Sequence, residues 1–280
     1  MVTVGLIADT HIPDRFRNLP PSVFAAFSDV ELILHAGDVG SLRVLDQLAE
    51  IAPVVAVHGN DDPEIVTEAL PYLQLLMIGG RRVVLCHTHY PDRTTELASR
   101  TDDWDEHFER RLRFARQYHA DVIVYGHTHI PLVQQREGIL IVNPGAIASR
   151  NLWMRQVIQT VAIIHLSPHE PPTVEHIDLN SGQLYTPAFD EDSFEATASY
   201  YNQPILSPTL YEQRGWLWNE LRPVAPQDVQ KVIRNLAFEC WDNGHKLLTP
   251  EILAQALLAL DNRRIRDTLR QNPTFAPYVT

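Results

Sequence analysis

Short runs of apolar, mostly β-branched residues alternate with polar stretches that suit helices throughout the first half of the chain. This alternation is typical of α/β proteins, in which helices connect the buried strands of a central sheet. Buried strands are predicted at residues 3–8, 31–35, 54–57, 121–125, 139–142, 157–166 and 173–179. Two further runs, at residues 73–78 and 82–86, flank Gly79-Gly80 and predict a hairpin.

One helix is predicted within this pattern, at residues 105–118. Phe108, Leu112 and Ala115 recur there at helical spacing and define one apolar face. The helix leads into the strand at 121–125, so we expect its apolar face to pack on the sheet.

The pattern changes after about residue 180, where strand-like runs stop and helical patterns begin. Val229, Ile233 and Leu236 share one helical face, and Thr249-Pro250 has the form of a helix N-cap followed by its first residue. We therefore expect two domains, an α/β domain at residues 1–180 and a mainly helical appendage at residues 181–280. The apolar stripes of the appendage require a partner, either the first domain or another subunit.

Charge and hydropathy limit the partners of the chain. Its 23 Lys and Arg against 35 Asp and Glu give a net charge of −12, which argues against a broad basic surface for duplex nucleic acid. No apolar run approaches the ~20 residues that cross a bilayer, and the first residues lack the basic region of a secretory signal. We therefore expect a cytoplasmic protein that contacts neither duplex nucleic acid nor membrane.

Five clusters of metal-ligating side chains directly follow predicted strands. They are Asp9-Thr10-His11, Gly37-Asp38, Gly59-Asn60-Asp61-Asp62, His87-Thr88-His89 and Gly126-His127-Thr128-His129. Ligand sites of α/β sheets lie beyond the carboxyl ends of the strands, so clusters distant in sequence are expected to meet there. A set of carboxylates, imidazoles and an amide without cysteine suits Mn²⁺, iron or Zn²⁺.

This ordered set resembles the signature of the calcineurin-like metallophosphoesterase family, which runs DxH, GD, GN, H and GHxH. The match covers about residues 1–165, and the GN-x-D form of residues 59–62 resembles the branch with YfcE-like and MJ-type phosphodiesterases. The resemblance implies an α/β fold, a four-layer αββα metallophosphoesterase sandwich, here with a C-terminal helical extension. It also implies two divalent metal ions at the edge of the sandwich.

The ligands of these ions follow from the resemblance alone. Asp9, His11, Asp38 and His129 would hold the first ion, and Asp38, Asn60, His87 and His127 the second, with Asp38 bridging both. Mn²⁺ is the expected metal, with iron, Zn²⁺, Ni²⁺ or Co²⁺ as alternatives. A hydroxide bridging the ions would attack phosphorus directly, and Asn60 would hold the charge that develops on the phosphoryl oxygens.

One position departs from the pattern. Many family members carry a histidine directly after Gly-Asn as a candidate general acid, and this chain has Asp61 there. The catalytic candidates are therefore Asn60 and Asp61, with His58, His89 or water as the source of the proton. Thr88 replaces the glycine usual in the branch, so its side chain would change the shape of the pocket.

The expected function is that of a dinuclear-metal phosphoesterase, specifically a phosphodiesterase acting on small phosphodiesters. The missing histidine favours diesters, because diester-active relatives often lack it. The alternatives are a phosphomonoesterase or protein phosphatase, and a non-catalytic protein-binding scaffold, which the intact ligand positions disfavour. A homodimer is a further possibility. Histidines outside the motifs, among them His107, and the pair Trp216 and Trp218 are interpreted as structural.

Overall fold

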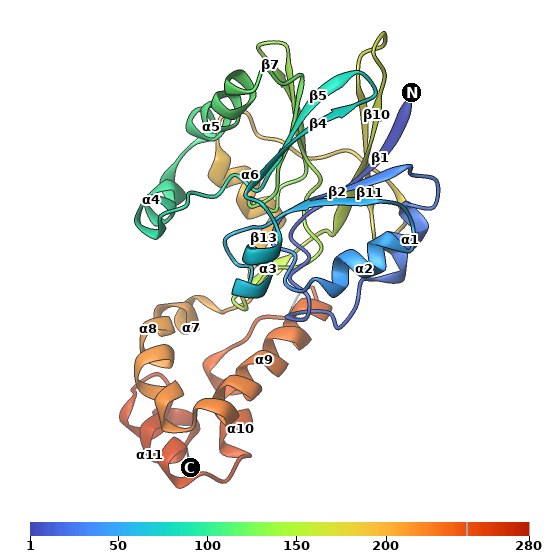
Figure 1. Cartoon of the computed structure of the whole chain (residues 1–280). Helices are drawn as coiled ribbons and strands as arrows, with labels where there is room; N and C mark the ends of the chain where they lie inside the picture. Colours follow the sequence, from blue (N-terminus) through green and yellow to red (C-terminus); the bar gives the residue numbers. More distant parts are fainter. Residues whose placement is uncertain (245, 280) are drawn as a thin grey trace. The chain divides into compact units, whose positions relative to one another are not determined.

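The computed structural model describes residues 1–244 and 246–279, and the chain divides into two compact units (Figure 1). The first comprises residues 1–150 and 156–201, and the second comprises residues 151–155 and 202–280. This boundary lies later than the expected one, since residues 181–201 stay with the first unit. The reason is that β12 (Gln183–Tyr185) pairs with β11 (Thr173–Asp178) and that Tyr201 is fully buried in the core of the first unit.

The first unit contains two mixed sheets. The six-stranded sheet has the order β12-β11-β10-β1-β2-β3, with β1 at Val2–Ile7, β2 at Leu32–Ala36, β3 at Val54–Val57 and β10 at Thr160–Leu166. The five-stranded sheet has the order β4-β5-β6-β8-β7, with strands at Leu73–Ile78, Arg81–Cys86, Val122–Val124, Ile139–Asn143 and Leu132–Arg136 in that order. Strands β1, β2 and β3 run parallel, as do β5, β6 and β8. Their carboxyl ends therefore share an edge of each sheet.

Successive side chains of a strand point to opposite faces of its sheet. The two sheets therefore share one inner core, and each has an outer core on its other face. In β5, Val83 and Leu85 face the inner core between the sheets, whereas Val84 faces the helix α5 (Trp104–Gln117). The helices α1 (Pro21–Ala26) and α2 (Arg43–Ala49) cover the outer face of the other sheet (Figure 1). The predicted four-layer αββα arrangement is confirmed.

Local signals account for the two elements that matter most for the site. The α5 helix begins with a capping box, in which Asp103 accepts from the first turn and Glu106 accepts from the Asp103 backbone N–H. The predicted hairpin forms, with β4 and β5 antiparallel across Gly79-Gly80. Three short helices complete the unit, at α3 (Glu64–Ala69), α4 (Arg93–Ala98) and α6 (Phe194–Tyr201).

The second unit is helical and has a core of its own. Its helices are α7 (Pro208–Glu212), α8 (Arg214–Trp216), α9 (Pro226–Asp242), α10 (Pro250–Leu258) and α11 (Arg263–Gln271), with a short ribbon of β9 (Met154–Gln156) and β13 (Asn202–Pro204). Val229, Leu253 and Leu269 belong to one buried cluster, so the apolar stripes meet one another within the unit. Trp216 stacks on Phe275 in the same cluster, as its structural interpretation predicts.

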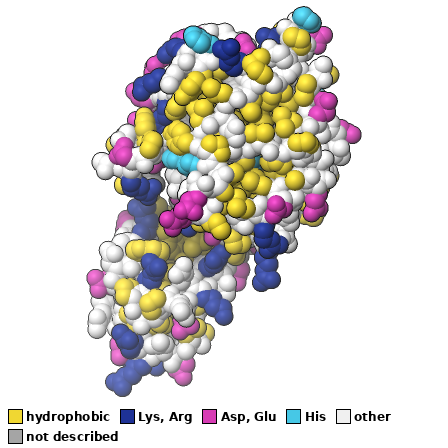
Figure 2. All heavy atoms as spheres, viewed as in Figure 1, with side chains coloured by type: hydrophobic (Ala, Val, Ile, Leu, Met, Phe, Trp, Pro, Cys, Tyr) yellow, Lys and Arg dark blue, Asp and Glu magenta, His cyan; other side chains and the backbone are white. Residues whose placement is uncertain are grey.

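Figure 2 shows hydrophobic side chains gathered over the part of the first unit that carries β4 and β5. Leu75 and Met77 of β4 are exposed there, because β4 is an edge strand with no further strand beside it. Within the described residues, each helix lacks the combined length and apolar character needed to cross a bilayer.

Candidate metal centre

The five clusters of the sequence come together at one edge of the sandwich. They follow the carboxyl ends of β1, β2 and β3 in one sheet and of β5 and β6 in the other. The inner core holds these two sheets face to face. Parallel strands therefore bring together side chains that lie more than one hundred residues apart in the sequence.

Asp9 is the centre of a first group of ligand atoms. Its Oδ1 lies 3.3 Å from Nε2 of His129 and 4.0 Å from Nε2 of His11. All three side chains offer one ligand atom within 4.8 Å of the others. This group corresponds to three of the four ligands expected for the first ion.

Asp38 connects this group to a second one. Its Oδ2 lies 3.3 Å from Nε2 of His87 and 3.6 Å from Nε2 of His11. Asp9, Asp38 and His87 form one close group, and His11, Asp38 and Asp61 form another. Asp38 thus lies where a carboxylate shared by two ions is expected, and Asp61 lies close enough to add a further oxygen.

His127 and Asn60 lie at the side of these groups. Nε2 of His127 is 2.9 Å from Oε1 of Glu96, and its ring centroid is 5.1 Å from that of His87. His127 is not part of the three close groups found among the described residues. The Asn60 side chain lines the same cavity as Asp38 and His127.

Backbone strain is concentrated on the expected ligands. Five of them have φ between 45° and 75°, in the left-handed region: Asp9, His11, Asp38, His127 and His129. This conformation costs a residue with a Cβ atom about 1–2 kcal/mol. Such strain persists only where the surroundings enforce it, and it gathers at functional sites.

Two motif glycines stand where a side chain would clash with a carboxylate of the site. A Cβ atom on Gly59 would lie 2.1 Å from Oδ1 of Asp38, and one on Gly126 would lie 2.9 Å from Oδ2 of Asp9. The glycines of the Gly-Asn and Gly-His motifs therefore let two strand ends approach the carboxylates closely.

Two of the imidazoles, those of His87 and His129, and the carboxylates of Asp9 and Asp38 hold one another in their charged forms, whereas burial lowers the pKa of His11 and of His127. Burial would raise the pKa of Asp9, and the charge of His129 outweighs it, so this pKa is lowered. Burial would likewise raise the pKa of Asp38, but the charge of His87 outweighs burial, so the pKa of Asp38 is also lowered. In return, Asp38 overcomes the effect of burial and raises the pKa of His87 to about 10. The protonated rings of His87 and His129 therefore balance the charge of the ionised carboxylates.

The donor set fits a divalent metal. Nε2 of His11, Nε2 of His87 and Oδ1 of Asn60 are buried without a hydrogen bond of ordinary geometry to any described residue. Nδ1 of His87 lies 2.8 Å from the Ala36 carbonyl oxygen. When the ring is neutral, Nδ1 donates to that carbonyl and leaves the Nε2 lone pair for a metal. A cation bound by these nitrogen and oxygen atoms would give all three their missing partner.

A cavity of about 280 Å³ opens beside this set. It is lined by Asp38, Asn60, Asp61, Glu96, Ser99, His107, His127, Thr128, His129, Phe194 and Ala198. Two of the four catalytic candidates, Asn60 and Asp61, are therefore at the cavity.

The other two candidates, His58 and His89, lie together on the other side of His87, whose ring centroid is 5.5 Å from that of His89. The ring centroids of His58 and His89 are 5.6 Å apart, both rings pack near Tyr72, and neither is among the described residues that line the cavity. Burial and the neighbouring His87 lower the pKa of His89 to about 3, so its ring is neutral at pH 7.

The sequence analysis does not anticipate the residues that α4, α5 and α6 contribute. Glu96 of α4 is buried and pairs with His127, while His107 of α5 and Phe194 of α6 form part of the cavity wall. None of them follows a strand, so the strand-end pattern could not reveal them. These three residues reach the site only because α4, α5 and α6 pack beside the edge of the sheets where the strands end.

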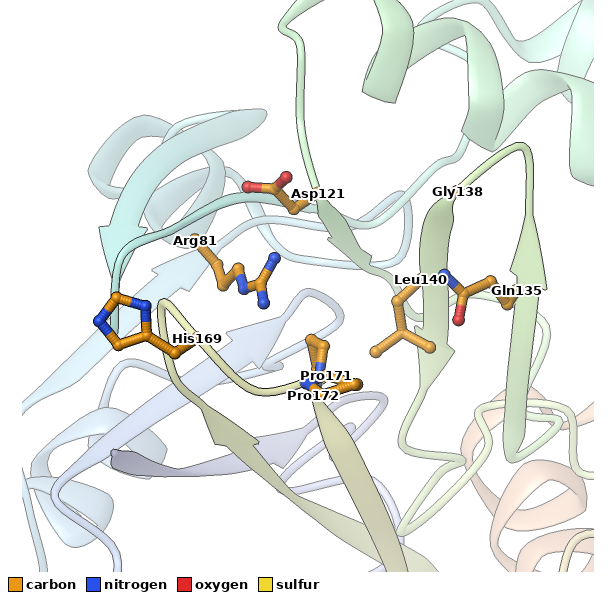
Figure 3. Close-up of a pocket in the computed structure, with 8 residues that line it drawn as sticks. All are labelled: Arg81, Asp121, Gln135, Gly138, Leu140, His169, Pro171 and Pro172. Carbon is orange, nitrogen blue, oxygen red and sulfur yellow. The ribbon is translucent and has the colours of Figure 1, made fainter.

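A second cavity, of about 270 Å³, lies at the opposite edge, where β5 and β6 begin (Figure 3). Its charged side chains are already paired. The Arg81 guanidinium donates to the carbonyl oxygens of Ser167 and Glu170, and Asp121 accepts from the backbone N–H of Arg82. This cavity therefore presents no metal-ligating cluster comparable to the first.

Comparison with known proteins agrees with this geometry. The family model of the calcineurin-like phosphoesterase superfamily domain matches residues 2–168. A probable metallophosphoesterase of Methanothermobacter thermautotrophicus is 41% identical over 145 residues, which cover 51% of this chain and 76% of that protein. A phosphodiesterase of Methanocaldococcus jannaschii is 24% identical over 160 residues, covering 51% of this chain and 82% of that protein.

Solved structures show the same fold. Vps29 of Entamoeba histolytica, crystallised with zinc, superposes with a TM-score of 0.52 and 21% identity, covering 67% of this chain and 98% of Vps29. Vps29 of Cryptosporidium parvum superposes with a TM-score of 0.51 and 20% identity, covering 67% and 96% of the two chains. Identities this low describe the architecture alone.

Proposed function

The chain belongs to the calcineurin-like phosphoesterase superfamily, and on this premise we propose that it is a metal-dependent phosphodiesterase acting on small phosphodiesters. The observation that carries the proposal is the buried carboxylate of Asp38, with Nε2 of His87 3.3 Å and Nε2 of His11 3.6 Å from its Oδ2. This is the arrangement needed for one carboxylate to serve two adjacent cations.

The proposed ligands are those that the family signature implies. Asp9, His11, Asp38 and His129 would hold one ion, and Asp38, Asn60, His87 and His127 the other. When bound, two divalent ions supply positive charge to the phosphate and lower the pKa of water from 15.7 to about 7. Mn²⁺ is the proposed metal, and nitrogen and oxygen donors also accommodate iron, Zn²⁺, Ni²⁺ and Co²⁺.

The protein's own groups prepare the ligands and the substrate site. Glu96 accepts a hydrogen bond from Nε2 of His127, so Nδ1 remains the free nitrogen of that ring. An amide that binds a cation through its oxygen keeps its NH₂ as a donor, and we assign the NH₂ of Asn60 to a phosphoryl oxygen. Asp38 also accepts from the backbone N–H of Asp61 at 2.8 Å, which fixes the carboxylate from the loop after β3.

Charge at the cavity favours diesters over monoesters. Three carboxylates, of Asp38, Asp61 and Glu96, line it, and its described lining residues include no Lys or Arg. A phosphomonoester carries about −1.5 to −2 charges at pH 7, whereas a diester carries one. Bound metal would attract both charges of a monoester, but the described cavity lining adds no Lys or Arg, and the carboxylates of Asp61 and Glu96 would face the second charge. The similarity to the phosphodiesterase of Methanocaldococcus jannaschii supports the same choice.

Size points to small substrates. The cavity of about 280 Å³ is near the lower limit of the ~300–1,000 Å³ typical of small-molecule sites. A diester with compact substituents would fill it.

The test compares bis-p-nitrophenyl phosphate with p-nitrophenyl phosphate, using protein stripped of metal and reloaded with Mn²⁺. We expect metal-dependent cleavage of the diester well above that of the monoester. Faster cleavage of the monoester would replace the diesterase assignment with a monoesterase one. If the metal-loaded protein cleaves neither substrate, the enzymatic proposal is overturned in favour of a binding scaffold.

A further inference from the structure

His107 is a buried histidine outside every sequence motif, and it forms part of the wall of the metal-site cavity. It lies on α5 with 6% of its surface exposed. The same cavity is lined by Asp38 and His127. A bound diester would therefore lie within reach of the wall to which His107 belongs.

The hydrogen-bond role of the His107 ring is fixed by Arg111, one helical turn later. Nη1 of Arg111 lies 3.1 Å from Nδ1 of His107 and 2.6 Å from its carbonyl oxygen. An arginine only donates hydrogen bonds, so Nδ1 of His107 accepts. Burial and the charge of Arg111 lower the pKa of His107 to about 2, which keeps the ring neutral. The neutral ring must then carry its hydrogen on Nε2.

This Nε2–H group lacks a partner. It is buried and makes no hydrogen bond to any residue that the structure describes. A buried donor left unsatisfied costs about 1–3 kcal/mol, and among the buried atoms of the described residues that lack a partner, Nε2 of His107 belongs to a residue that lines this cavity. By contrast, Nε2 of the buried His176 lies 2.7 Å from the carbonyl oxygen of Asn143.

The ring cannot easily turn away to find a partner. Phe194 of α6 stacks on it with centroids 3.9 Å apart and planes 21° apart. Phe194 is held in turn by its backbone N–H, which donates to Asp103 Oδ1 at 2.8 Å, and by the edge of Trp104. The wall that α5 and α6 present combines the apolar Phe194 and Ala198 with His107, whose Nε2–H is covered in this structure, so a small shift of the side chains over it must accompany binding.

We propose that His107 donates its Nε2–H to an uncharged oxygen on one ester substituent of the substrate, with that substituent against Phe194. This proposal rests on the proposed function and specifies its substrate class, a diester with an aromatic or nucleoside-like group that carries a neutral acceptor. An anionic oxygen is disfavoured because the carboxylate of Glu96 lines the same cavity.

The test uses His107→Phe, which keeps a flat ring on Phe194 and removes the donor. The control is His176→Phe, which removes a buried donor that already has a partner. Both are compared with the wild type on two diesters that share p-nitrophenol as the leaving group. The substituent that stays on phosphorus, which we place at His107, is a nitrophenyl group with a hydrogen-bond acceptor in bis-p-nitrophenyl phosphate and a methyl group without one in methyl p-nitrophenyl phosphate. The Tm of each protein is measured with and without the first diester.

For His107→Phe we expect KM for the bis-aryl diester to rise about 2- to 10-fold, the effect of one lost hydrogen bond. KM for the methyl diester should stay unchanged, whereas the Tm without ligand should fall, because phenylalanine removes the Nδ1 that accepts from the buried Arg111. His176→Phe should lower the Tm and leave the ratio of the two KM values unchanged. A lowered Tm for His107→Phe with an unchanged KM ratio would make His107 a structural residue and overturn the proposal.

The two proposals can fail separately. If the wild type loaded with Mn²⁺ cleaves neither diester, the proposed function fails. The role of His107 is then decided by ligand-induced stabilisation. It stands if bis-p-nitrophenyl phosphate raises the Tm of the wild type more than that of His107→Phe, and it falls if the two shifts are equal.

Discussion

Glu96, which is buried, and His127, which is partly buried, form a pair in which Oε1 of Glu96 lies 2.9 Å from Nε2 of His127. The second carboxylate oxygen of Glu96 accepts from the backbone N–H of Tyr90 at 2.8 Å. The carboxylate is therefore held at both oxygens, and it holds the imidazole in turn. Burial alone would raise the pKa of Glu96, but His127 outweighs burial and lowers it to about 2, so the pair contains a carboxylate.

Glu96→Gln should weaken metal binding without removing a ligand. A carboxylate behind a metal-binding histidine orients the ring and raises its basicity, and its loss typically costs about 10- to 100-fold in affinity. Titration calorimetry with Mn²⁺ would measure this loss, with Glu68→Gln, on the exposed side of α3, as the matched control. Equal affinities of the Glu96 variant and the wild type would show that Glu96 does not position His127.

Asp38→Asn should remove the paired metals and turnover together. Asp38 belongs to two of the close ligand groups, and asparagine offers one neutral oxygen where two ions need a shared carboxylate. Elemental analysis of the purified variant after dialysis against Mn²⁺ should give fewer than two ions per chain. A variant that keeps two ions and its diesterase activity would refute the bridging role.

Much of the α/β fold was predictable because buried strands and amphipathic helices leave periodic patterns. The run at 73–78 predicts β4 to the residue, and the helix predicted at 105–118 is α5, displaced by one residue. The strand β7 is missed because its sequence, Leu-Val-Gln-Gln-Arg, has no apolar alternation and its last residues are exposed. Short elements that pair only through the backbone give no such pattern.

The strand-end clusters were predictable as a set, but the helices that complete the cavity were not. Asp9, Asp38 and His87 follow strands whose parallel order brings them together, so sequence position and topology suffice. Glu96, His107 and Phe194 reach the cavity only through the tertiary placement of α4, α5 and α6. Residues 181–201 belong to the first unit because β12 pairs with β11. The sequence around β12 is rich in turn residues and does not predict this pairing.

The metal-free protein should lose stability as pH rises from 7.5 to 8.5, above the range in which buried neutral histidines such as His35 and His176 give the opposite trend. Asp38 overcomes burial and raises the pKa of His87 to about 10, against about 6.5 in an unfolded chain. The folded state then binds this proton more tightly, so its stabilisation is complete below pH 6.5 and is lost progressively toward pH 10. The pKa of the buried Cys86 thiol, raised by burial to about 12, adds a similar loss only above about pH 8.5.

The measurement is the Tm of EDTA-treated protein across this range. His87→Phe should flatten the decline. The Mn²⁺-loaded protein should show the opposite trend, because protons compete with metal for the imidazoles and metal affinity therefore rises with pH. A metal-free Tm that rises from pH 7.5 to 8.5 would contradict the assigned charge state of His87.

Gly59→Ala should disrupt the metal centre by a steric clash with Asp38. The added Cβ would lie 2.1 Å from Oδ1 of Asp38 and 2.6 Å from its backbone nitrogen, so the carboxylate must move. We expect lost metal binding and a lower Tm. Gly215→Ala is the control, because a Cβ there meets nothing within 4 Å and alanine favours a helix by about 1 kcal/mol. Retention of two ions by Gly59→Ala would show that Asp38 has room to shift.

Asp61→Asn should narrow the preference for diesters over monoesters. Asp61 lines the cavity and belongs to the close group with His11 and Asp38. Its carboxylate repels the second charge of a monoester more than the single charge of a diester. Two charges about 4 Å apart interact by roughly 4 kcal/mol at an effective dielectric constant near 20, and solvent and bound metal reduce this further. A severalfold fall in the ratio of kcat/KM for bis-p-nitrophenyl phosphate to that for p-nitrophenyl phosphate is therefore expected.

Metal content, measured on the same samples, separates this effect from the loss of a ligand. If two ions stay bound and the ratio is unchanged, the acidic wall does not select the substrate, and selectivity must come from the ester substituents.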